Sequence, residues 1–220
     1  MTWVKWILVG GLFVLGAVAR GRTEEGWALV GAGAANGGRV VILLTGFGPF
    51  GSVTDNPTGR IVHRLRARLA GRCPMPGHSF SARKLPVKFG VIEPLLAGAE
   101  IFLGTGVDAS ATAIRVETGA TNYFEDSETG RKGPIDPARP ETEFLRGGDL
   151  PTGILDPVAG FALDLGREGT AGSYVCNDTF YRARRRLARS YFLHVPNGPP
   201  ERDAELAEAL ASLFCRILGS

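Results

Sequence analysis

Apolar and polar positions along this chain follow each other in blocks typical of strands and helices. The uninterrupted apolar run at residues 40–44 predicts a central strand covered on both faces. A helix is expected to begin after it, near Asn56 and Pro57, because asparagine caps helices and proline suits their first turn. Gly71 is expected to end this helix. Its buried stripe consists of Ile61, Leu65 and Leu69.

The same kind of pattern continues to the end of the chain. Further strands are expected at residues 80–87, 100–104 and 191–195, and further helices at 91–97, 154–165, 174–188 and 203–218. Residues 118–150 are polar and rich in turn formers, which predicts a long ordered excursion of the kind that often serves function. Alternation of strands with helices predicts an α/β fold with a mostly parallel sheet.

Length and composition favour one globular domain. The chain has 220 residues, 44% of them hydrophobic, and the regular pattern places the domain at residues 39–220. Residues 20–38, rich in glycine and alanine, are expected to form a flexible lead-in. The net charge of +3 indicates no particular class of partner.

Residues 1–19 have the pattern of an export signal. Lys5 supplies a positive start, residues 6–19 are apolar and uncharged, and Ala17-Val18-Ala19 has the small-x-small pattern of a cleavage site. This apolar run is short for a membrane span, which needs about 20 residues. An uncleaved anchor through residues 6–19 is therefore only the second interpretation. A wrongly placed start codon is the third. The first two predict an exported or membrane-tethered protein and the third a cytoplasmic one.

Three cysteines and three histidines restrict the chemistry that this chain can perform. Cys73, Cys176 and Cys215 are far apart, and an odd number leaves at least one thiol free in a monomer. No pair of cysteine or histidine residues has the spacing of metal ligands, so no metal site is expected.

Residues 46–51 have the order G-x-G-x-x-G directly after the first strand, as in the dinucleotide-binding fingerprint. That fingerprint requires a helix that opens within the glycine loop and an acidic residue about 20 positions further on. Here the helix is expected to begin only near Pro57, and residues 64–72 contain no acidic residue. A nucleotide-binding oxidoreductase is therefore the weaker rival. We interpret Phe47 and Phe50 as an apolar wall for a small ligand, with simple core packing as the alternative.

Cys176 is the candidate nucleophile. It follows a turn of small residues, 170–173, and opens a predicted helix. The unpaired N–H groups and partial positive charge of a helix N-terminus stabilise a thiolate and can hold an oxyanion. A buried structural cysteine is the alternative interpretation.

A thiol nucleophile needs a histidine, and His194 is the best placed of the three. His63 points away from the apolar stripe of its helix, and His78 lies in a loop next to Gly77. His194 ends an apolar strand, at the sheet edge where parallel strands present functional side chains. A carboxylate usually orients such an imidazole. Glu117 is one candidate, and spacing alone does not select it over Asp126 or Asp136.

Several motifs, in order, resemble the pyroglutamyl-peptidase I family of cysteine peptidases. They are TGFGPFG at 45–51 followed by Asn56-Pro57, LPV at 85–87, AGSYVCN at 171–177 and FLHVP at 192–196. The resemblance extends from about Val40 to Leu218. It implies a single-domain three-layer αβα sandwich with a twisted, mostly parallel central sheet, of the phosphorylase/hydrolase-like kind.

The resemblance also implies an activity and a set of site residues. The activity is removal of an N-terminal pyroglutamyl residue from peptides, without a cofactor. Cys176 is the implied nucleophile, His194 its base and Glu117 the group that orients the histidine. The implied substrate-binding residues are Phe47, Phe50, Asn56 and Tyr174. Members of the family are as a rule cytoplasmic, and the sequence leaves the oligomeric state, a homo-oligomer included, open.

Two departures motivate a rival function. Ser127 stands where bacterial members of the family carry an arginine, and the segments 86–106 and 150–169 are shorter than usual. A catalytically impaired member that binds N-terminally blocked peptides is therefore the alternative. Nucleic acid is not expected as a partner, because no aromatic residues interleave with the arginines between residues 182 and 189.

Overall fold

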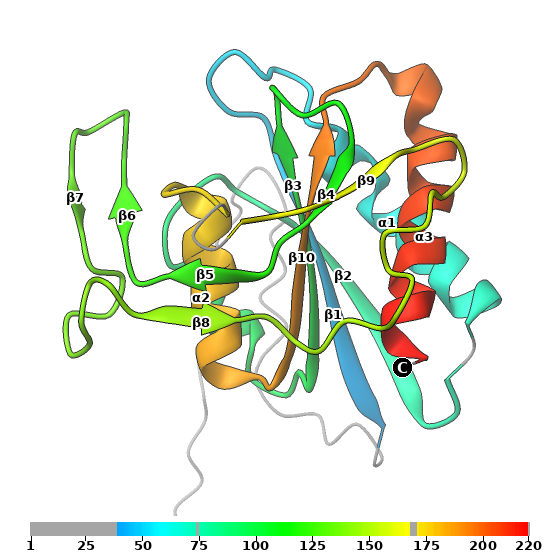
Figure 1. Ribbon diagram of the computed structural model, residues 1–220, viewed down its shortest axis with the longest axis horizontal. Helices are drawn as coiled ribbons and strands as arrows, with labels where there is room; N and C mark the ends of the chain where they lie inside the picture. The colour runs from blue at the N-terminus through cyan, green and yellow to red at the C-terminus, as the bar shows by residue number, and fades with distance from the viewer. Residues whose placement is uncertain (1–38, 74, 168–170, 220) are drawn as a thin grey trace, which may run out of the picture. The chain divides into compact units, whose positions relative to one another are not determined.

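The structure, a computed structural model, describes residues 39–73, 75–167 and 171–219. A six-stranded sheet with the order β2-β1-β3-β10-β4-β9 forms its centre. Helix α2 (Val175–Arg186) covers one face, and helices α1 (Pro57–Arg72) and α3 (Asp203–Leu218) pack together on the other (Figure 1). The expected α/β fold with three layers is confirmed.

The expectations for residues 1–19 and 20–38 lie outside the described residues. No helix in the described part of the chain is long and apolar enough to span a membrane.

The central sheet is mostly parallel, as expected. Its strands are β1 (Val40–Phe47), β2 (His78–Leu85), β3 (Ile101–Asp108), β4 (Ile114–Val116), β9 (Leu163–Leu165) and β10 (Arg189–Pro196). Every neighbouring pair is parallel except β10 with β4, which is antiparallel. The carboxyl ends of β1, β2, β3 and β10 therefore meet at one edge of the sheet. Strand β4 runs in the opposite direction, so its carboxyl end points toward the opposite edge.

Alternate residues of each central strand enter two separate cores. Those facing α2 include Leu43, Phe102 and Phe192. Those facing α1 and α3 include Ile42, Leu103 and Leu193. Successive side chains of a strand point to opposite faces, so the position of a residue in its strand decides which layer it contacts. Burial on both faces explains the uninterrupted apolar runs.

The main helices begin and end close to the predicted residues. Asn56 caps α1, its side-chain oxygen accepting a hydrogen bond from the Thr58 N–H at 3.0 Å. Gly71 lies inside α1, which ends one residue later at Arg72. The helix expected at 91–97 is wrong: only a short 3-10 turn, η1 (Glu93–Leu95), is present. A second such turn, η2 (Pro200–Arg202), precedes α3.

The excursion at residues 118–150 is ordered, as expected, and lies beside α2 (Figure 1). It contains the antiparallel pairs β5 (Gly119–Thr121) with β8 (Phe144–Arg146), and β6 (Phe124–Glu125) with β7 (Lys132–Gly133). The fully buried side chain of Asn122 ties its halves together, donating to the carbonyls of Asp136, Arg139 and Pro140. The excursion is therefore an ordered part of the domain, held by hydrogen bonds of its own.

The helix expected at residues 154–165 is wrong. Ile154, Val158 and Phe161 have helical spacing and are buried, yet the chain there is irregular and ends in β9. Gly153 and Gly160 have φ angles of 75° and 78°, in the left-handed region that a right-handed helix cannot use. Apolar spacing therefore predicted burial correctly and conformation incorrectly.

A disulfide joins the two helices on the outer face of the sheet. Cys73, the residue after α1, is bonded to Cys215 in the last turn of α3, 142 positions along the chain. Cys176 is the free cysteine. Because the disulfide joins residues 142 positions apart in the sequence, it constrains a large part of the chain.

Replacing Cys73 and Cys215 together by serine is expected to lower the free energy of unfolding by about 2–5 kcal/mol, since the crosslink restricts the unfolded chain. Urea denaturation followed by circular dichroism measures the change. Cys176→Ser is the matched control, with an expected change of about 1 kcal/mol or less. A double variant as stable as the wild type would contradict the disulfide.

Candidate active site

A cavity of about 320 Å³ opens at the carboxyl edge of the sheet. The ends of β1, β3 and β10 and the N-terminus of α2 form its walls. Two larger hollows of about 540 Å³ lie elsewhere. The first is lined by arginines of α2 that already pair with Glu93, Asp136 and Asp178. We therefore identify the site by its chemistry, and only the smaller cavity contains the free cysteine and a histidine.

Cys176 is the second residue of α2, and its sulfur rests on β3. A Cβ atom at Gly106 would lie 2.6 Å from the Cys176 sulfur, so only glycine permits this contact. The fully buried side chain of Asn177 accepts from the Thr121 N–H and donates to the carbonyls of Thr121 and Tyr123. These bonds hold the start of α2 against the excursion, and the sulfur in turn against the sheet.

His194 and Glu117 form a buried hydrogen-bonded pair. The Nδ1 atom of His194 lies 2.7 Å from Oε1 of Glu117, which is 2% exposed. Glu117 follows β4, and its backbone N–H donates to the carbonyl of Phe192 on the antiparallel β10. Cys176 lines the same cavity as His194, and its interaction with the ring is among the causes that raise the pKa of His194. The three side chains thus form one chain of contacts.

The charges around His194 favour its protonated form. Burial lowers the pKa of His194, but interactions with Cys176, and then with Glu117, outweigh it and raise the pKa to about 10. Near neutral pH the ring of His194 is therefore an imidazolium, placed between Cys176 and Glu117. The ring also contacts Phe192 edge-on, with centroids 5.2 Å apart, which keeps it from rotating freely.

The loop after β1 carries the predicted phenylalanines. Phe47 is buried at the strand end, Phe50 is partly buried, and both line the cavity. Asn56 also lines it, and its amide donates to the carbonyl of Gly48. The hydroxyl of Thr58 accepts from the Phe47 N–H. The cap of α1 therefore holds the loop that forms the apolar wall.

The glycines of this loop serve close packing. A Cβ atom at Gly46 would lie 2.2 Å from the carbonyl oxygen of Thr58, and Gly51 has a φ angle of 48°. No helix opens within the loop, since α1 begins at Pro57. The G-x-G-x-x-G order is thus explained by a close approach between strand and helix and by a left-handed turn.

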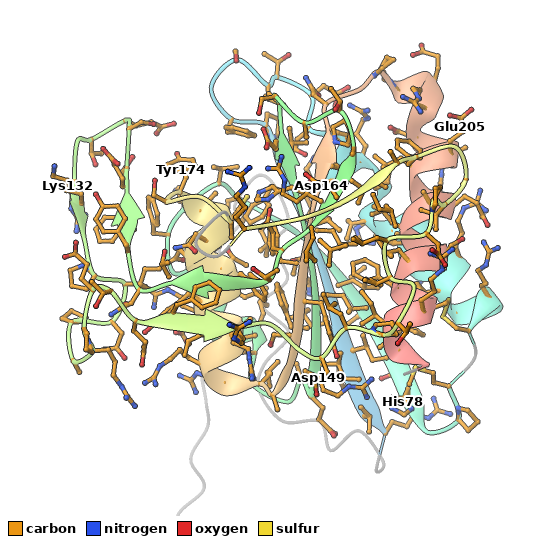
Figure 2. The ribbon with its side chains drawn as sticks, viewed as in Figure 1. His78, Lys132, Asp149, Asp164, Tyr174 and Glu205 are labelled. Atoms are coloured by element: carbon orange, nitrogen blue, oxygen red, sulfur yellow. A yellow bond between two sulfur atoms is a disulfide. The ribbon has the colours of Figure 1, made fainter. Side chains whose placement is uncertain are left out.

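Tyr174 completes the aromatic side of the cavity from the N-terminal end of α2 (Figure 2). Its ring meets Phe89 edge-on at 5.4 Å, and Phe89 in turn contacts Phe124 of β6 at 5.1 Å. Burial raises the pKa of Tyr174, and the charges of Glu128 and Asp126 raise it further. The hydroxyl therefore stays protonated and neutral near neutral pH.

The other sequence candidates lie away from this chain of contacts. Asp126 caps the turn after β6, and Asp136 pairs with Arg185. Ser127 is exposed in the same turn and does not line the cavity. His78 begins β2 and so lies at the opposite edge of the sheet from Tyr174 (Figure 2). Among the described residues no group of three metal-ligating side chains is present.

Sequence reasoning missed two features of the cavity. The strand expected at residues 100–104 stops short of Gly106, whereas β3 continues through Gly106 to Asp108, which lines the cavity. A glycine inside an apolar strand often marks a close approach by another segment, and the Gly104-Thr105-Gly106 series carries that signal. Asp108 had no comparable signal in the sequence.

Removing the thiol by Cys176→Ala is expected to lower the pKa of His194 from about 10, because the interaction with Cys176 that raises this pKa is lost. NMR titration of the imidazole signals measures it, and the chain has only three histidines to assign. His63→Gln, on the exposed face of α1, is the control and should leave His194 unchanged. A His194 pKa that does not fall in Cys176→Ala would refute the contact.

Comparison with known proteins finds relatives by sequence and by fold. No family model matches the chain. A pyrrolidone-carboxylate peptidase of Pseudomonas fluorescens is 31% identical over 73% of this chain and 80% of its own, and one of Gloeobacter violaceus is 29% identical over 73% and 83%. The crystal structure of pyrrolidone carboxyl peptidase from Thermus thermophilus matches with a TM-score of 0.60 at 26% identity, covering 80% of this chain and 98% of that one.

Similarity in fold extends to a further solved structure. Pyroglutamyl peptidase I of Bacillus amyloliquefaciens matches with a TM-score of 0.63 at 22% identity, over 83% of this chain and 98% of that one. At this identity the match shows the fold alone, whereas the Pseudomonas relative is similar enough in sequence to show common descent. The chain therefore belongs to the pyrrolidone-carboxylate peptidase family, also called pyroglutamyl peptidase I, which its motifs resemble.

Proposed function

We propose that this protein is a cysteine peptidase that hydrolyses the bond after an N-terminal pyroglutamyl residue, with Cys176, His194 and Glu117 as its catalytic groups. The observation that carries the proposal is the continuous contact from the Glu117 carboxylate through His194 to the Cys176 sulfur, at the wall of an aromatic cavity. A nucleophile, a base and a group that orients the base are the parts that acyl transfer needs.

In the first half of the reaction the Cys176 thiolate attacks the pyroglutamyl carbonyl carbon. The N–H groups of the first turn of α2 have no acceptors within the helix and are available to the oxygen that becomes negative. His194 then gives its proton to the leaving nitrogen, the carbon–nitrogen bond breaks, and the peptide departs with a free amine. Glu117 keeps the proton-bearing Nδ1 turned away from the sulfur throughout.

In the second half, water hydrolyses the thioester. His194 takes a proton from the water, the hydroxyl attacks the carbonyl carbon, and the sulfur leaves as a thiolate. Pyroglutamate is released, and the original ion pair of Cys176 and His194 is restored. Every proton moves between groups of this chain, substrate and water.

Selection of the substrate rests on the uncharged lactam ring. Phe47, Phe50, Val53 and Tyr174 supply aromatic and aliphatic surface to it. A free glutamyl residue would bring an ammonium and a carboxylate into the same surface, and both would lose water without finding a charged partner there. The aromatic side of this cavity of about 320 Å³ would receive the lactam ring.

The rival function, a binder of blocked peptides without turnover, has weaker support. One of its two motives was Ser127, which lies in an exposed turn between β6 and β7 and outside the cavity wall. The hydrogen bond of His194 with Glu117, and the interaction with Cys176 that raises the pKa of His194, support catalysis over binding alone. Turnover therefore decides between the two functions.

The wild-type chain is expected to release the fluorophore from pyroglutamyl-aminomethylcoumarin. Cys176→Ala and His194→Ala should each lower kcat by about 10³-fold or more, because each removes a reacting group. His63→Ala, a histidine change on an exposed helix face, is the matched control and should turn over like the wild type. Normal turnover by either site variant would eliminate this mechanism.

Glu117→Gln is expected to lower kcat by about 10²–10⁴-fold, because the amide keeps a similar shape but no longer supports the imidazolium and its useful tautomer. Continuous fluorescence assays with the same substrate measure it. Glu100→Gln, at an exposed position before β3, is the matched control. A rise in KM alone, with kcat intact, would assign Glu117 to substrate binding.

We further propose that the protein is exported, with residues 1–19 as its signal. Two features support this: the apolar stretch 6–19 ends in the small-x-small pattern of a cleavage site, and Cys73 is joined to Cys215. Disulfides form and persist in oxidising compartments and are rare in the cytoplasm. Retention of residues 6–19 as a membrane tether is the variant of this proposal without cleavage.

N-terminal sequencing of the protein purified from its native host tests export. The expected mature N-terminus is Arg20. When the protein is alkylated without a reductant, mass spectrometry is expected to find Cys73 and Cys215 unmodified, because they are joined in a disulfide. A protein that keeps Met1 and fractionates with membranes would support the tether. Cytoplasmic protein with both thiols alkylated would refute export.

A further inference from the structure

Asp108 is a carboxylate in the wall of the proposed active site to which the reaction described above gives no role. It is the last residue of β3, its side chain is 24% exposed, and it lines the same cavity as Cys176 and His194. Among the described residues that line this cavity, no other aspartate or glutamate is present. The question is which part of a substrate this charge would meet.

Strand geometry places Asp108 on the face of the sheet that carries the reacting groups. Gly106 faces the Cys176 sulfur, and Asp108 comes two residues later, so both point to the same side. The register of β3 with β10 pairs Gly106 with His194 and Asp108 with Pro196. Asp108 therefore lies about 7 Å beyond the sulfur contact, toward the opening of the cavity.

The order of the strands divides the cavity into two ends. Phe47 is the last residue of β1 and Phe50 follows it, whereas His194 lies two residues before the end of β10, with β3 between these two strands. The lactam ring would occupy the aromatic end. The leaving nitrogen must reach His194, which protonates it, so the residue after the cleaved bond lies toward the β3–β10 end. Asp108 and Ala109 form the wall there.

Asp108 is held as an oriented, ionised carboxylate. Ser110 donates to its Oδ1 from the N–H at 2.9 Å and from the hydroxyl at 2.6 Å, and Arg115 approaches Oδ2 at 2.9 Å. Burial raises the pKa of Asp108, but the Ser110 bonds and the charges of His194 and Arg115 outweigh it and hold the pKa below its usual value. A carboxylate has about four acceptor positions, so one remains for a ligand.

Arg115 does not cancel the negative charge at this end of the cavity. Its guanidinium lies 2.9 Å from Asp108 and 3.4 Å from Asp164 of β9, so one cation faces two carboxylates. Arg115 itself does not line the cavity, whereas Asp108 does. A side chain that enters along this wall therefore meets the carboxylate before the guanidinium.

We propose that Asp108 selects the residue after the cleaved bond, favouring peptides in which a lysine or arginine follows the pyroglutamyl residue and disfavouring those with aspartate or glutamate. This inference rests on the proposed peptidase function and specifies its substrate class. Asp108 acts by attraction or repulsion of a charge at the β3–β10 end, and takes no part in breaking bonds.

The test compares kcat/KM of the full chain on three amides: pyroglutamyl-lysine, pyroglutamyl-glutamine and pyroglutamyl-glutamate, with released pyroglutamate measured by chromatography. The wild type is expected to prefer lysine over glutamate about tenfold, with glutamine between them. In Asp108→Asn, which keeps an oxygen for the Ser110 bonds, that ratio should fall to near one. In Asp108→Lys it should invert.

Asp164→Asn is the matched control. It removes a carboxylate from the same Arg115 but lies on β9 outside the cavity wall (Figure 2), so the wild-type ratio should persist. Because each ratio is internal to one protein sample, partial misfolding of a variant cancels.

A wild-type ratio near one, a ratio unchanged in Asp108→Asn, or an equal change in Asp164→Asn would overturn the role of Asp108 while leaving the peptidase intact. If the wild type releases no pyroglutamate from any of the amides or from the coumarin substrate, the proposed function fails and this inference with it.

Discussion

The contact between the Cys176 sulfur and the bare backbone of Gly106 is the constraint on which the site depends. Because residue 106 has no side chain, the N-terminus of α2 can approach the sheet until its second residue touches β3. His194 is the register partner of Gly106 on the next strand, so the same approach brings sulfur and imidazole together. Any larger side chain at this position would separate the helix from the strand that carries the base.

Burial strengthens the electrostatic interaction between His194 and Glu117. Glu117 is 2% exposed and His194 6%, so water does not screen their interaction as it would at a surface. Phe192 and Gly104 supply apolar surroundings on the same face of the sheet. In such surroundings an unpaired charge would be costly, and the hydrogen bond between His194 and Glu117 gives each of these two buried groups a partner.

The two faces of the sheet carry different tasks. On one face, called the outer face here, α1 and α3 pack on each other and are joined by the Cys73–Cys215 disulfide, which stabilises this layer. On the inner face α2 and the excursion at 118–150 form the site, and side-chain amides of Asn122 and Asn177 replace regular pairing there. Alternation along each strand keeps the two sets of contacts separate, so loops on the inner face can differ without loosening the outer one.

Sequence by itself determined the elements whose signals are local. Apolar spacing located α1, α3 and the central strands, and Asn56 followed by Pro57 marked the start of α1. Such signals involve neighbours within about two helical turns, and the backbone responds to them directly. They failed at 154–165, where the apolar spacing is helical but left-handed glycines interrupt it.

The motifs named Cys176, His194 and Glu117, but only the tertiary structure decided that they touch. Glu117 and His194 are 77 positions apart, and they meet because β4 runs antiparallel to β10. The pairing of Cys73 with Cys215 and the entry of Asp108 into the cavity wall depend likewise on strand order and helix packing. These are properties of the whole chain: periodicity constrains which face a residue takes, whereas the distance between remote residues is set only when the layers assemble.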